Sequence, residues 1–405
     1  MTVSPEIEKT MESSSFIRKM FEDGIRLRKI LGEDKVYDFS LGNPDLDVPE
    51  ELKAIIKEVA EDDTKGCHGY MTNAGYPFCR EAIGEKISLE QGVRVSGEFV
   101  VMASGAAGAM NVLLKAVLVP GDRILVPSPY FSEYTHYVAN HGGRLVPVET
   151  NPDFSLNLEN IRNAFTGNTR GIIINSPNNP TGRIYTEEEL IALRSLLYEL
   201  GKKNGDIPFV IADEPYRDIL YDGAVVPSVF KIFEKSVIVS SFAKNLSIPG
   251  ERIGYVAVNP LCPDGKELAG ACGFTTRILG FVNAPAFFQR VIAKGWNVKA
   301  DYSSYAERCS LLKEVLDSAG IEYFNPQGAF YLFCRVPAKN ESSGNCESSQ
   351  AFCCVLKKYG ILAVPGVGFG REGYIRLAFC VSPDTIKNSK ESFKMAVEDW
   401  KQIKL

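Results

Sequence analysis

Short apolar runs recur through the middle of the chain, and each is bounded by proline, glycine or asparagine. They cover residues 99–102, 124–126, 171–174, 208–212, 237–239 and 255–258. Unbroken apolar runs of this length are typical of strands that are buried on both faces of a sheet. We therefore expect each run to form a buried strand.

Helical patterns lie between these runs. One covers residues 186–200, where Thr186 and Glu189 have the spacing of a capping box at a helix start. Residues 15–31 also have a helix-like pattern. Strands that alternate with helices predict an α/β fold with a doubly wound, mostly parallel sheet.

The C-terminal part of the chain has a different character. A long helix-like stretch at 285–316 is followed by residues 323–335 and then by a polar segment at 339–349. This shift indicates a second, smaller α+β domain. We divide the chain into an N-terminal segment, 1–48, that belongs to the small domain, a large domain at 49–285, and a small C-terminal domain at 286–405.

Length and charge narrow the classes of protein to consider. A chain of 405 residues is long enough for two or three domains with substantial cores. The 45 Lys and Arg and the 50 Asp and Glu are interspersed and give a net charge of -5, so nucleic acid or an anionic membrane is not the expected partner. The first twelve residues lack the apolar core of a secretory signal, and no segment is apolar enough to span a bilayer. We expect a soluble cytoplasmic protein.

Cysteine and histidine usage indicates neither a disulfide framework nor a metal site. The ten cysteines are scattered along a long chain without a C-x-x-C pair, which favours buried, reduced thiols. The three histidines, His68, His136 and His141, have no metal-ligand spacing to a cysteine or to one another. We therefore expect no metal.

Polar residues follow three of the predicted strands. They are Asn175-Ser-Pro-Asn-Asn-Pro-Thr-Gly182, Asp213-Glu-Pro-Tyr216 and Ser240-Ser-Phe-Ala-Lys244. Ligands of open α/β sheets gather beyond the carboxyl ends of the strands. Each residue alone also has an ordinary structural explanation, such as a helix cap, a turn or a surface charge. Together, a lysine, an acid, a phenol and an amide on neighbouring strand ends form the set that an aromatic aldehyde cofactor needs.

These motifs, with Arg252-Ile-Gly-Tyr255, resemble those of fold-type I pyridoxal-phosphate-dependent aminotransferases of the aspartate aminotransferase superfamily, classes I and II. The resemblance extends from about residue 41 to residue 379. It implies a large domain whose sheet binds pyridoxal 5'-phosphate and a smaller α+β domain.

The resemblance implies a role for each residue at the strand ends. Lys244 would hold the cofactor as a Schiff base and move the proton between the substrate Cα and C4′ of the cofactor. Asp213 would pair with the pyridine nitrogen and keep it protonated. Tyr216 and Asn179 would donate hydrogen bonds to the 3′-oxygen of the ring.

The cofactor phosphate requires an anion cradle. Residues 104–109 are small and open a helix-like run, so that backbone N–H groups can approach an anion. By resemblance, the cofactor-binding residues here are Gly105, Ala106, Ala107, Ser241 and Arg252. Tyr70 resembles the tyrosine that reaches the phosphate of the neighbouring subunit. A homodimer with active sites at the subunit interface is therefore the expected unit.

Three further residues resemble parts of the family's substrate site. Phe131 matches the aromatic side chain that stacks on the cofactor ring, although the adjacent Tyr130 leaves this assignment open by one residue. Arg376 resembles the arginine that binds the substrate α-carboxylate, and it lies within an apolar run where an unpaired charge would be costly. Gly42 matches the glycine whose backbone borders the substrate, and Asn179 is expected to contact the substrate as well.

The chain departs from the family pattern at two positions. Ala243 stands where many relatives have a serine near the phosphate. Ala106 stands where one branch of aspartate aminotransferases has a lysine that reads the distal carboxylate. Arg277 resembles, with an offset of one residue, the arginine that another branch donates across the dimer to that carboxylate.

These observations lead us to expect a ping-pong aminotransferase of amino acid metabolism. We expect aspartate as the first candidate L-amino acid and 2-oxoglutarate as the 2-oxo acid. One alternative is a C-S lyase, which would use the same lysine and acid for β-elimination. Another is a ligand sensor fused to a DNA-binding module, but only about forty residues precede Leu41, too few for such a module and a linker.

Overall fold

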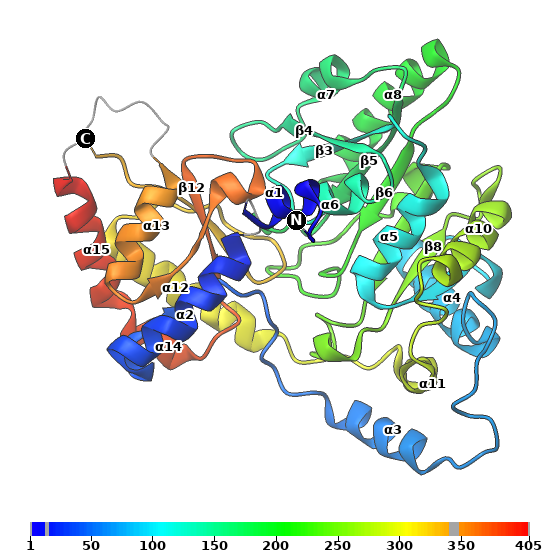
Figure 1. Ribbon diagram of the computed structural model, residues 1–405, viewed down its shortest axis with the longest axis horizontal. Helices are drawn as coiled ribbons and strands as arrows, with labels where there is room; N and C mark the ends of the chain where they lie inside the picture. The colour runs from blue at the N-terminus through cyan, green and yellow to red at the C-terminus, as the bar shows by residue number, and fades with distance from the viewer. Residues whose placement is uncertain (1, 13–15, 340–347, 404–405) are drawn as a thin grey trace.

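The computed structural model describes residues 2–12, 16–339 and 348–403. A seven-stranded sheet forms its centre, in the order β2-β8-β7-β6-β5-β3-β4 (Figure 1). The strands are β2 (Val100–Ala103), β3 (Arg123–Ser128), β4 (Arg144–Glu149), β5 (Thr169–Asn175), β6 (Phe209–Asp213), β7 (Ser236–Ser241) and β8 (Gly254–Val258). The six predicted strands are all present.

The sheet is mostly parallel, as expected. Strands β3 to β7 pair in parallel, and β8 runs antiparallel to both of its neighbours, β7 and β2. The pattern of apolar runs did not predict β4, because this strand lies at the edge of the sheet and most of its residues are partly or fully exposed. An edge strand lacks the unbroken apolar run that marks a strand buried on both faces.

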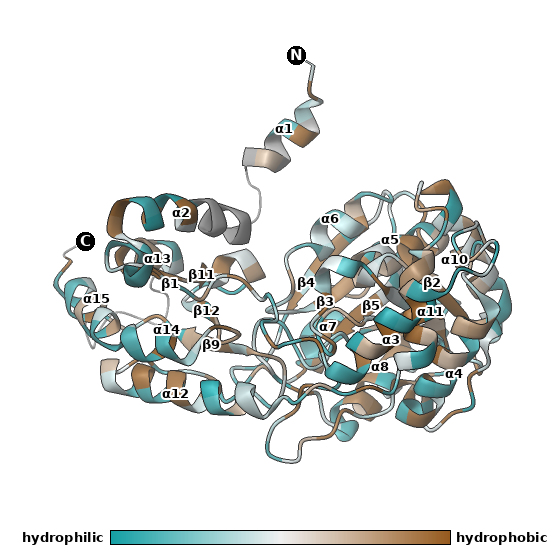
Figure 2. Cartoon of the chain, turned by 90° about the horizontal axis from the view of Figure 1, so that it is seen from below, coloured by the Kyte–Doolittle hydropathy of each residue, from teal (hydrophilic) through white to brown (hydrophobic). Residues whose placement is uncertain are grey.

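Helices cover both faces of this sheet. In Figure 2, α5, α6 and α10 lie on one side of the strands and α4 and α8 on the other. The helices of this part are α3 (Glu50–Glu61), α4 (Pro77–Gln91), α5 (Gly105–Val117), α6 (Tyr134–Ala139), α7 (Leu158–Ala164), α8 (Glu187–Asn204), α9 (Val229–Ile232), α10 (Gly265–Ile278) and α11 (Ala286–Gly295). They enclose one large hydrophobic core with the sheet. The doubly wound arrangement is thus confirmed.

Helix α8 begins as predicted, with a reciprocal capping box. The Thr186 hydroxyl accepts a hydrogen bond from the Glu189 amide at 3.2 Å, and the Glu189 carboxylate accepts one from the Thr186 amide at 2.8 Å. Two backbone donors that the first helical turn would leave unpaired are thereby satisfied. The helix ends before Gly205, whose φ of 86° suits glycine.

A second, smaller core brings the two ends of the chain together. Strand β1 (Tyr37–Asp38) pairs with β10 (Ile361–Leu362), and a three-stranded antiparallel sheet has the order β11-β12-β9. These strands are β11 (Val364–Pro365), β12 (Tyr374–Ala378) and β9 (Tyr331–Arg335). The helices here are α2 (Phe16–Leu31), α12 (Ser303–Ala319), α13 (Ser349–Lys358), α14 (Pro383–Asn388) and α15 (Lys390–Gln402). This part is the expected smaller α+β unit.

The long helix-like stretch predicted at 285–316 is two helices, so that prediction was wrong. Helix α11 ends at Gly295, where Leu52 and Ile55 of the large core lie close, while α12 packs on α14 and α15 in the small core. The Asp301 carboxylate accepts a hydrogen bond from the Ser303 amide at 2.9 Å in the turn that precedes the second helix. The chain passes from one core to the other between them. Most of the predicted polar segment, 340–347, lies outside the described residues.

The described residues were also compared with the requirements of disulfides, membrane spans and metal sites. The nine cysteines within the described ranges form no disulfide with one another, and seven of them are buried. No helix in the described part of the chain has the length and apolar character needed to cross a membrane. The same residues contain no group of three or more His, Cys, Asp or Glu that could hold a metal ion. Helix α1 (Pro5–Glu12) stands away from the rest of the chain in Figure 2.

Candidate active site

A pocket of about 410 Å³ lies where the carboxyl ends of β5, β6 and β7 meet the start of α5. Its walls come from both cores, since residues 41–43 and strands β9 and β12 also contribute. The predicted site residues that line it are Gly42, Ala106, Ala107, Phe131, Asn179, Asp213, Tyr216, Ser241, Lys244, Arg252 and Arg376. Residues that are far apart in sequence thus meet at the sheet edge where ligands of α/β proteins bind.

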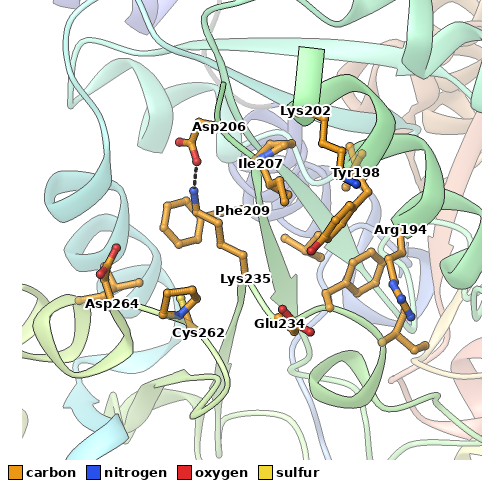
Figure 3. A pocket seen from close by; sticks show the side chains of 18 of the residues that line it. Arg194, Tyr198, Lys202, Asp206, Ile207, Phe209, Glu234, Lys235, Cys262 and Asp264 are labelled. Carbon is orange, nitrogen blue, oxygen red and sulfur yellow. Dashed lines mark hydrogen bonds and ion pairs between the residues drawn. The ribbon is translucent and has the colours of Figure 1, made fainter. Parts of the chain in front are cut away.

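A second hollow, of about 500 Å³, lies at the opposite edge of the sheet, where β6 and β7 begin (Figure 3). Phe209 and Phe233 contribute to its apolar walls, and Lys235 contacts Asp206 there at 2.5 Å. None of the predicted site residues lines this hollow. The candidate chemistry therefore belongs to the pocket at the carboxyl edge.

Lys244 lies on the turn after β7 and extends its amine into the pocket. Its Nζ donates a hydrogen bond to the Gly42 carbonyl oxygen at 2.7 Å. Removal from water lowers the pKa of Lys244 to about 8, and the nearby Arg376 and Arg252 charges contribute to this shift. A neutral fraction of this amine is therefore present near physiological pH, as a nucleophile or a proton carrier requires.

Asp213 ends β6 with its carboxylate buried against the pocket. The Tyr134 hydroxyl donates a hydrogen bond to Oδ2, whereas Oδ1 has no partner among the residues that the structure describes. Burial raises the pKa of Asp213 to about 6, and the Tyr134 hydrogen bond opposes this shift. A buried polar atom without a partner is unusual in a native protein and is common where a ligand binds.

A chain of amides connects the neighbouring strand ends. The Asn175 side chain donates to the Asp213 carbonyl oxygen at 2.9 Å and accepts from the Asn179 backbone amide at 2.7 Å. The Asn179 side-chain oxygen in turn accepts a hydrogen bond from Arg376 Nη1 at 3.1 Å. The acid, the amide and the arginine are thereby held in one network.

Arg376 lies on β12 and is 1% exposed. Its Nη2 donates to the Ser40 carbonyl oxygen at 2.5 Å, and its Nε has no partner within the described part of the chain. Burial lowers the pKa of Arg376 below its ordinary value. No described carboxylate pairs with this guanidinium. A buried cation in this state fits a bound anion, because a charge without a counterion is costly to bury.

Tyr216 and Tyr331 share a buried hydrogen bond between their hydroxyls, 2.7 Å apart. The Arg376 guanidinium lies over the Tyr331 ring, 4.6 Å from its centroid. Burial raises the pKa of Tyr331 to about 12 and that of Tyr216 above its ordinary value. A Cβ at Gly42 would lie 2.1 Å from the Tyr331 hydroxyl, so this close approach requires glycine.

Arg252 and the start of α5 form a cationic corner. Gly105 opens the helix with a φ of 71°, and a Cβ there would lie 2.7 Å from Arg252 Nη2. The Ser104 side chain makes no capping hydrogen bond, so it does not occupy the amides of the first turn. Ser241 ends β7 at the same pocket. Unpaired helix N–H groups beside a guanidinium favour a phosphate.

Three predicted residues, Gly105, Tyr70 and Arg277, do not line the pocket of their own chain, although Gly105 lies beside the pocket residue Arg252. Tyr70 is 91% exposed, and Arg277 is exposed near the end of α10. Both were expected to act across a subunit boundary, and these roles stay predictions. At the aromatic wall, Phe131 lines the pocket, whereas Tyr130 packs beside Gly370.

Tyr134, Tyr331 and Asn175 are among the residues of the pocket that had no predicted role. Tyr134 follows Phe131 by three residues at the start of α6, a spacing that puts two side chains on one side of a helical turn. That spacing was the only local signal for Tyr134. Tyr331 begins β9, and its partner Tyr216 is distant in sequence, so local pattern could not pair them.

The donors and acceptors of this pocket fit pyridoxal phosphate. An unpaired carboxylate oxygen on Asp213 suits a protonated ring nitrogen, and the Gly105 and Arg252 corner suits a phosphate dianion. The Lys244 amine lies in the same cavity for an aldehyde carbon. Arg376 is left for a second anion.

Comparisons with known proteins agree with this interpretation. The family model described as aminotransferase class I and II matches residues 34–393. A probable aspartate/prephenate aminotransferase of Aquifex aeolicus is 32% identical over 90% of this chain and 91% of its own length, and the aspartate aminotransferase of Bacillus subtilis is 28% identical over 91% and 93%. An amino transferase structure from Eubacterium rectale has a TM-score of 0.92 at 37% identity and covers 99% of both chains. Thermus thermophilus aspartate aminotransferase with maleate has a TM-score of 0.84 at 28% identity, covering 98% of this chain and 100% of its own.

Proposed function

Because the chain belongs to the family of class I and II aminotransferases, we propose that Lys244, Asp213 and Arg376 carry out its transamination. Enzymes of this family depend on pyridoxal phosphate, which when bound withdraws electrons from the substrate Cα. The observation that supports the proposal is the meeting of three side chains in one pocket: a lysine of lowered pKa, a carboxylate with an unpaired oxygen, and a buried arginine that no described carboxylate pairs with.

Lys244 is proposed to hold the cofactor through its amine and later to move a proton at the substrate Cα. Both tasks require a neutral amine, and the lowered pKa of Lys244 provides one near physiological pH. The Gly42 carbonyl oxygen orients Nζ by accepting its hydrogen bond. Withdrawal from water thus prepares the amine without a dedicated base.

Asp213 is proposed to hold the ring nitrogen of the cofactor protonated. Its Oδ2 is already bound by Tyr134, so Oδ1 is the atom available to the ring. Tyr216 and Asn179 are proposed to hydrogen-bond the ring oxygen, and Phe131 to stack on the ring. Gly105, Ala106, Ala107, Ser241 and Arg252 are proposed to bind the phosphate.

Arg376 is proposed to orient the substrate by binding its α-carboxylate. The two guanidinium nitrogens that contact Asn179 and Ser40 hold the plane of the fork. A fixed fork suits a carboxylate, which accepts two parallel hydrogen bonds. Substrates that share an α-carboxylate would therefore bind in one orientation, whatever their side chain.

We propose aspartate as the amino donor and 2-oxoglutarate as the acceptor. Several relatives are named aspartate aminotransferases, and others aspartate/prephenate aminotransferases. Among the residues that line the pocket, the lysines and arginines are Lys244, Arg252 and Arg376. A second carboxylate needs one more cation, and we propose that Arg277 of the partner subunit provides it. A C-S lyase is not favoured, since the named relatives are aminotransferases.

The proposed unit is a homodimer in the cytoplasm. Exposed apolar side chains lie close to Tyr70 and Arg277 in sequence, namely Phe78, Phe274, Ile278 and Phe281, and burial of such groups favours association. Unpaired cysteines are usual in reducing compartments, and the nine described cysteines are unpaired. We also propose that Tyr70 reaches the phosphate bound by the partner subunit.

A half-reaction screen tests this function. The purified holoenzyme is mixed with single amino acids while the absorbance of the bound cofactor is followed, and Lys244→Ala serves as the matched control. We expect a spectral change with aspartate and glutamate in the wild-type protein and a loss of turnover by orders of magnitude in the variant. Normal transamination by Lys244→Ala would contradict the proposal, and release of ammonia and pyruvate from a cysteine conjugate would indicate the lyase.

A further inference from the structure

A cluster of charged side chains lies behind the active site, on the far side of the turn that follows β6. Its members are Lys86 and Glu90 on α4, and Glu214, Arg217 and Asp218 on the turn. Lys86 pairs with Glu90, and Arg217 Nη1 pairs with Glu214 Oε2 at 2.9 Å. We call these five residues the charged cluster. It connects α4 to the turn that carries Tyr216.

Asn245 joins this cluster from the other side. Its Nδ2 donates a hydrogen bond to Asp218 Oδ2 at 2.7 Å, and Lys86 Nζ lies 4.0 Å from the same carboxylate oxygen. The Asn245 backbone oxygen accepts a hydrogen bond from the Tyr302 hydroxyl at 2.8 Å. Asn245 is only 6% exposed. Its side chain is therefore buried, with the amide nitrogen facing Asp218.

The hydrogen bond between Asn245 and Asp218 joins two segments that each carry a residue of the site. Asn245 directly follows Lys244, and Asp218 follows Tyr216 by two residues. The bond thus connects the turn that carries the lysine with the turn that carries the tyrosine. A hydrogen bond to a charged group is stronger than one between neutral groups, so this bond can hold the two short turns in register.

We propose that Asn245 and Asp218 are positioning residues, whose hydrogen bond holds the turn of Lys244 against the turn of Tyr216. Lys86 assists by fixing the Asp218 carboxylate from α4. Neither residue lines the substrate pocket, so they act through their neighbours. This inference rests on the roles proposed above for Lys244 and Tyr216.

The test measures the amine itself in cofactor-free protein. Wild type, Asn245→Ala, Asp218→Ala and the double variant are acylated with acetic anhydride over a range of pH, and modification of Lys244 is quantified by mass spectrometry. When the turn loosens, the amine gains water, and the pH midpoint of its labelling should rise from about 8 toward its ordinary value by roughly one unit. The double variant should shift no further than the larger single variant, because both lose the same bond.

A matched control separates positioning from general destabilisation. Asn259 is also a buried asparagine, and its side chain donates to the Phe230 and Phe233 carbonyl oxygens at the opposite edge of the sheet. Asn259→Ala should lower the Tm without moving the midpoint of Lys244. Unchanged midpoints in both single variants, or shifts that simply add in the double variant, would overturn the proposal.

Two further comparisons keep the result interpretable. If Asn245→Ala does not fold, Asp218→Ala decides alone, since Asp218 is partly exposed and alanine removes the acceptor of the bond. A raised midpoint in that variant supports the inference, and an unchanged one overturns it. Normal transamination by Lys244→Ala would reject the proposed function, whereas the midpoint shifts would still report the bond between the two turns.

Discussion

The Tyr134 hydroxyl binds one oxygen of the Asp213 carboxylate and leaves the other without a partner among the described residues. Tyr134 comes from the start of α6 and Asp213 from the end of β6. The phenol thus fixes the rotation of the carboxylate and also favours its ionised form. One oxygen orients the group, and the second is available to the cofactor.

Replacing Tyr134 with Phe should therefore slow the reaction more than it weakens substrate binding. The loss of a hydrogen bond to a charged group costs about 1.5–3 kcal/mol, which corresponds to roughly a 10- to 100-fold fall in kcat. Steady-state kinetics with aspartate should show this fall with little change in KM. A rise in KM at constant kcat would place Tyr134 at the substrate instead.

Asp213 also predicts a pH dependence of stability in the cofactor-free protein. Its pKa of about 6 lies above the ordinary 3.8, so the folded chain retains this proton to higher pH than the unfolded chain. The free energy of unfolding should therefore fall as the pH rises from about 4 to 6. Asp213→Asn removes this titration and should be more stable than wild type by about 3 kcal/mol at pH 7.

Denaturant unfolding of both cofactor-free proteins at several pH values measures this difference. The gain should shrink as the pH falls and vanish near pH 4, where the carboxyl is protonated in both states. With the cofactor bound, the same variant should lose turnover, because it lacks the carboxylate charge that keeps the ring nitrogen protonated. A stability difference that is independent of pH would contradict the assigned cause.

Replacing Arg376 with Ala should weaken the binding of all amino acids and 2-oxo acids alike. Loss of a buried partner for a carboxylate costs roughly 2–5 kcal/mol, so KM should rise by roughly 30-fold or more. Arg376→Lys retains the charge but not the fork, and should recover only part of the loss. Kinetics with alanine, aspartate and an aromatic amino acid would test this, and an effect confined to one side-chain class would argue against the assignment.

Replacing Arg277 with Ala should lower kcat/KM for aspartate and glutamate strongly and leave kcat/KM for alanine and aromatic amino acids little changed. The expected loss of transition-state stabilisation for the two dicarboxylates is roughly 2–5 kcal/mol. The reason is that a second carboxylate in a largely dehydrated site needs a cation. Equal effects on all substrates would remove Arg277 as the specificity residue.

Mixed dimers test whether Arg277 acts across the interface. When Arg277→Ala protomers are combined with Lys244→Ala protomers, a cross-subunit arginine leaves one site of the heterodimer with neither lesion. Recovery of dicarboxylate activity is then expected. If Arg277 acted within its own chain, each site would carry one lesion and the activity would not recover.

The sequence predicted those parts of the site that lie directly after a buried strand. Asn179, Asp213 and Lys244 each follow an apolar run, and the strands that precede them are adjacent in the sheet. Arg376 was named from the family resemblance, and its place within an apolar run, where a charge requires a partner, supported that assignment. Local pattern therefore indicated the carboxyl edge of the sheet, and the resemblance supplied most of the other pocket residues.

Contacts between distant segments could not be predicted in the same way. The Tyr134 to Asp213 bond and the Tyr216 to Tyr331 bond depend on how the strands and the two cores are placed, which spacing along the chain does not encode. The break between α11 and α12 was missed for a similar reason. Both helices have apolar faces, but the two faces pack on different cores.

The pairing of Ser40 with Arg376 also affects how the protein is made. During translation, all seven strands of the large sheet, and the proposed cofactor-binding residues up to Arg252, are synthesised before β12. Domains generally fold during synthesis in order from the N-terminus. The nascent chain can therefore build the proposed cofactor side of the pocket while Ser40 still lacks its arginine. The ability to bind an amino acid arises only as the last strand emerges.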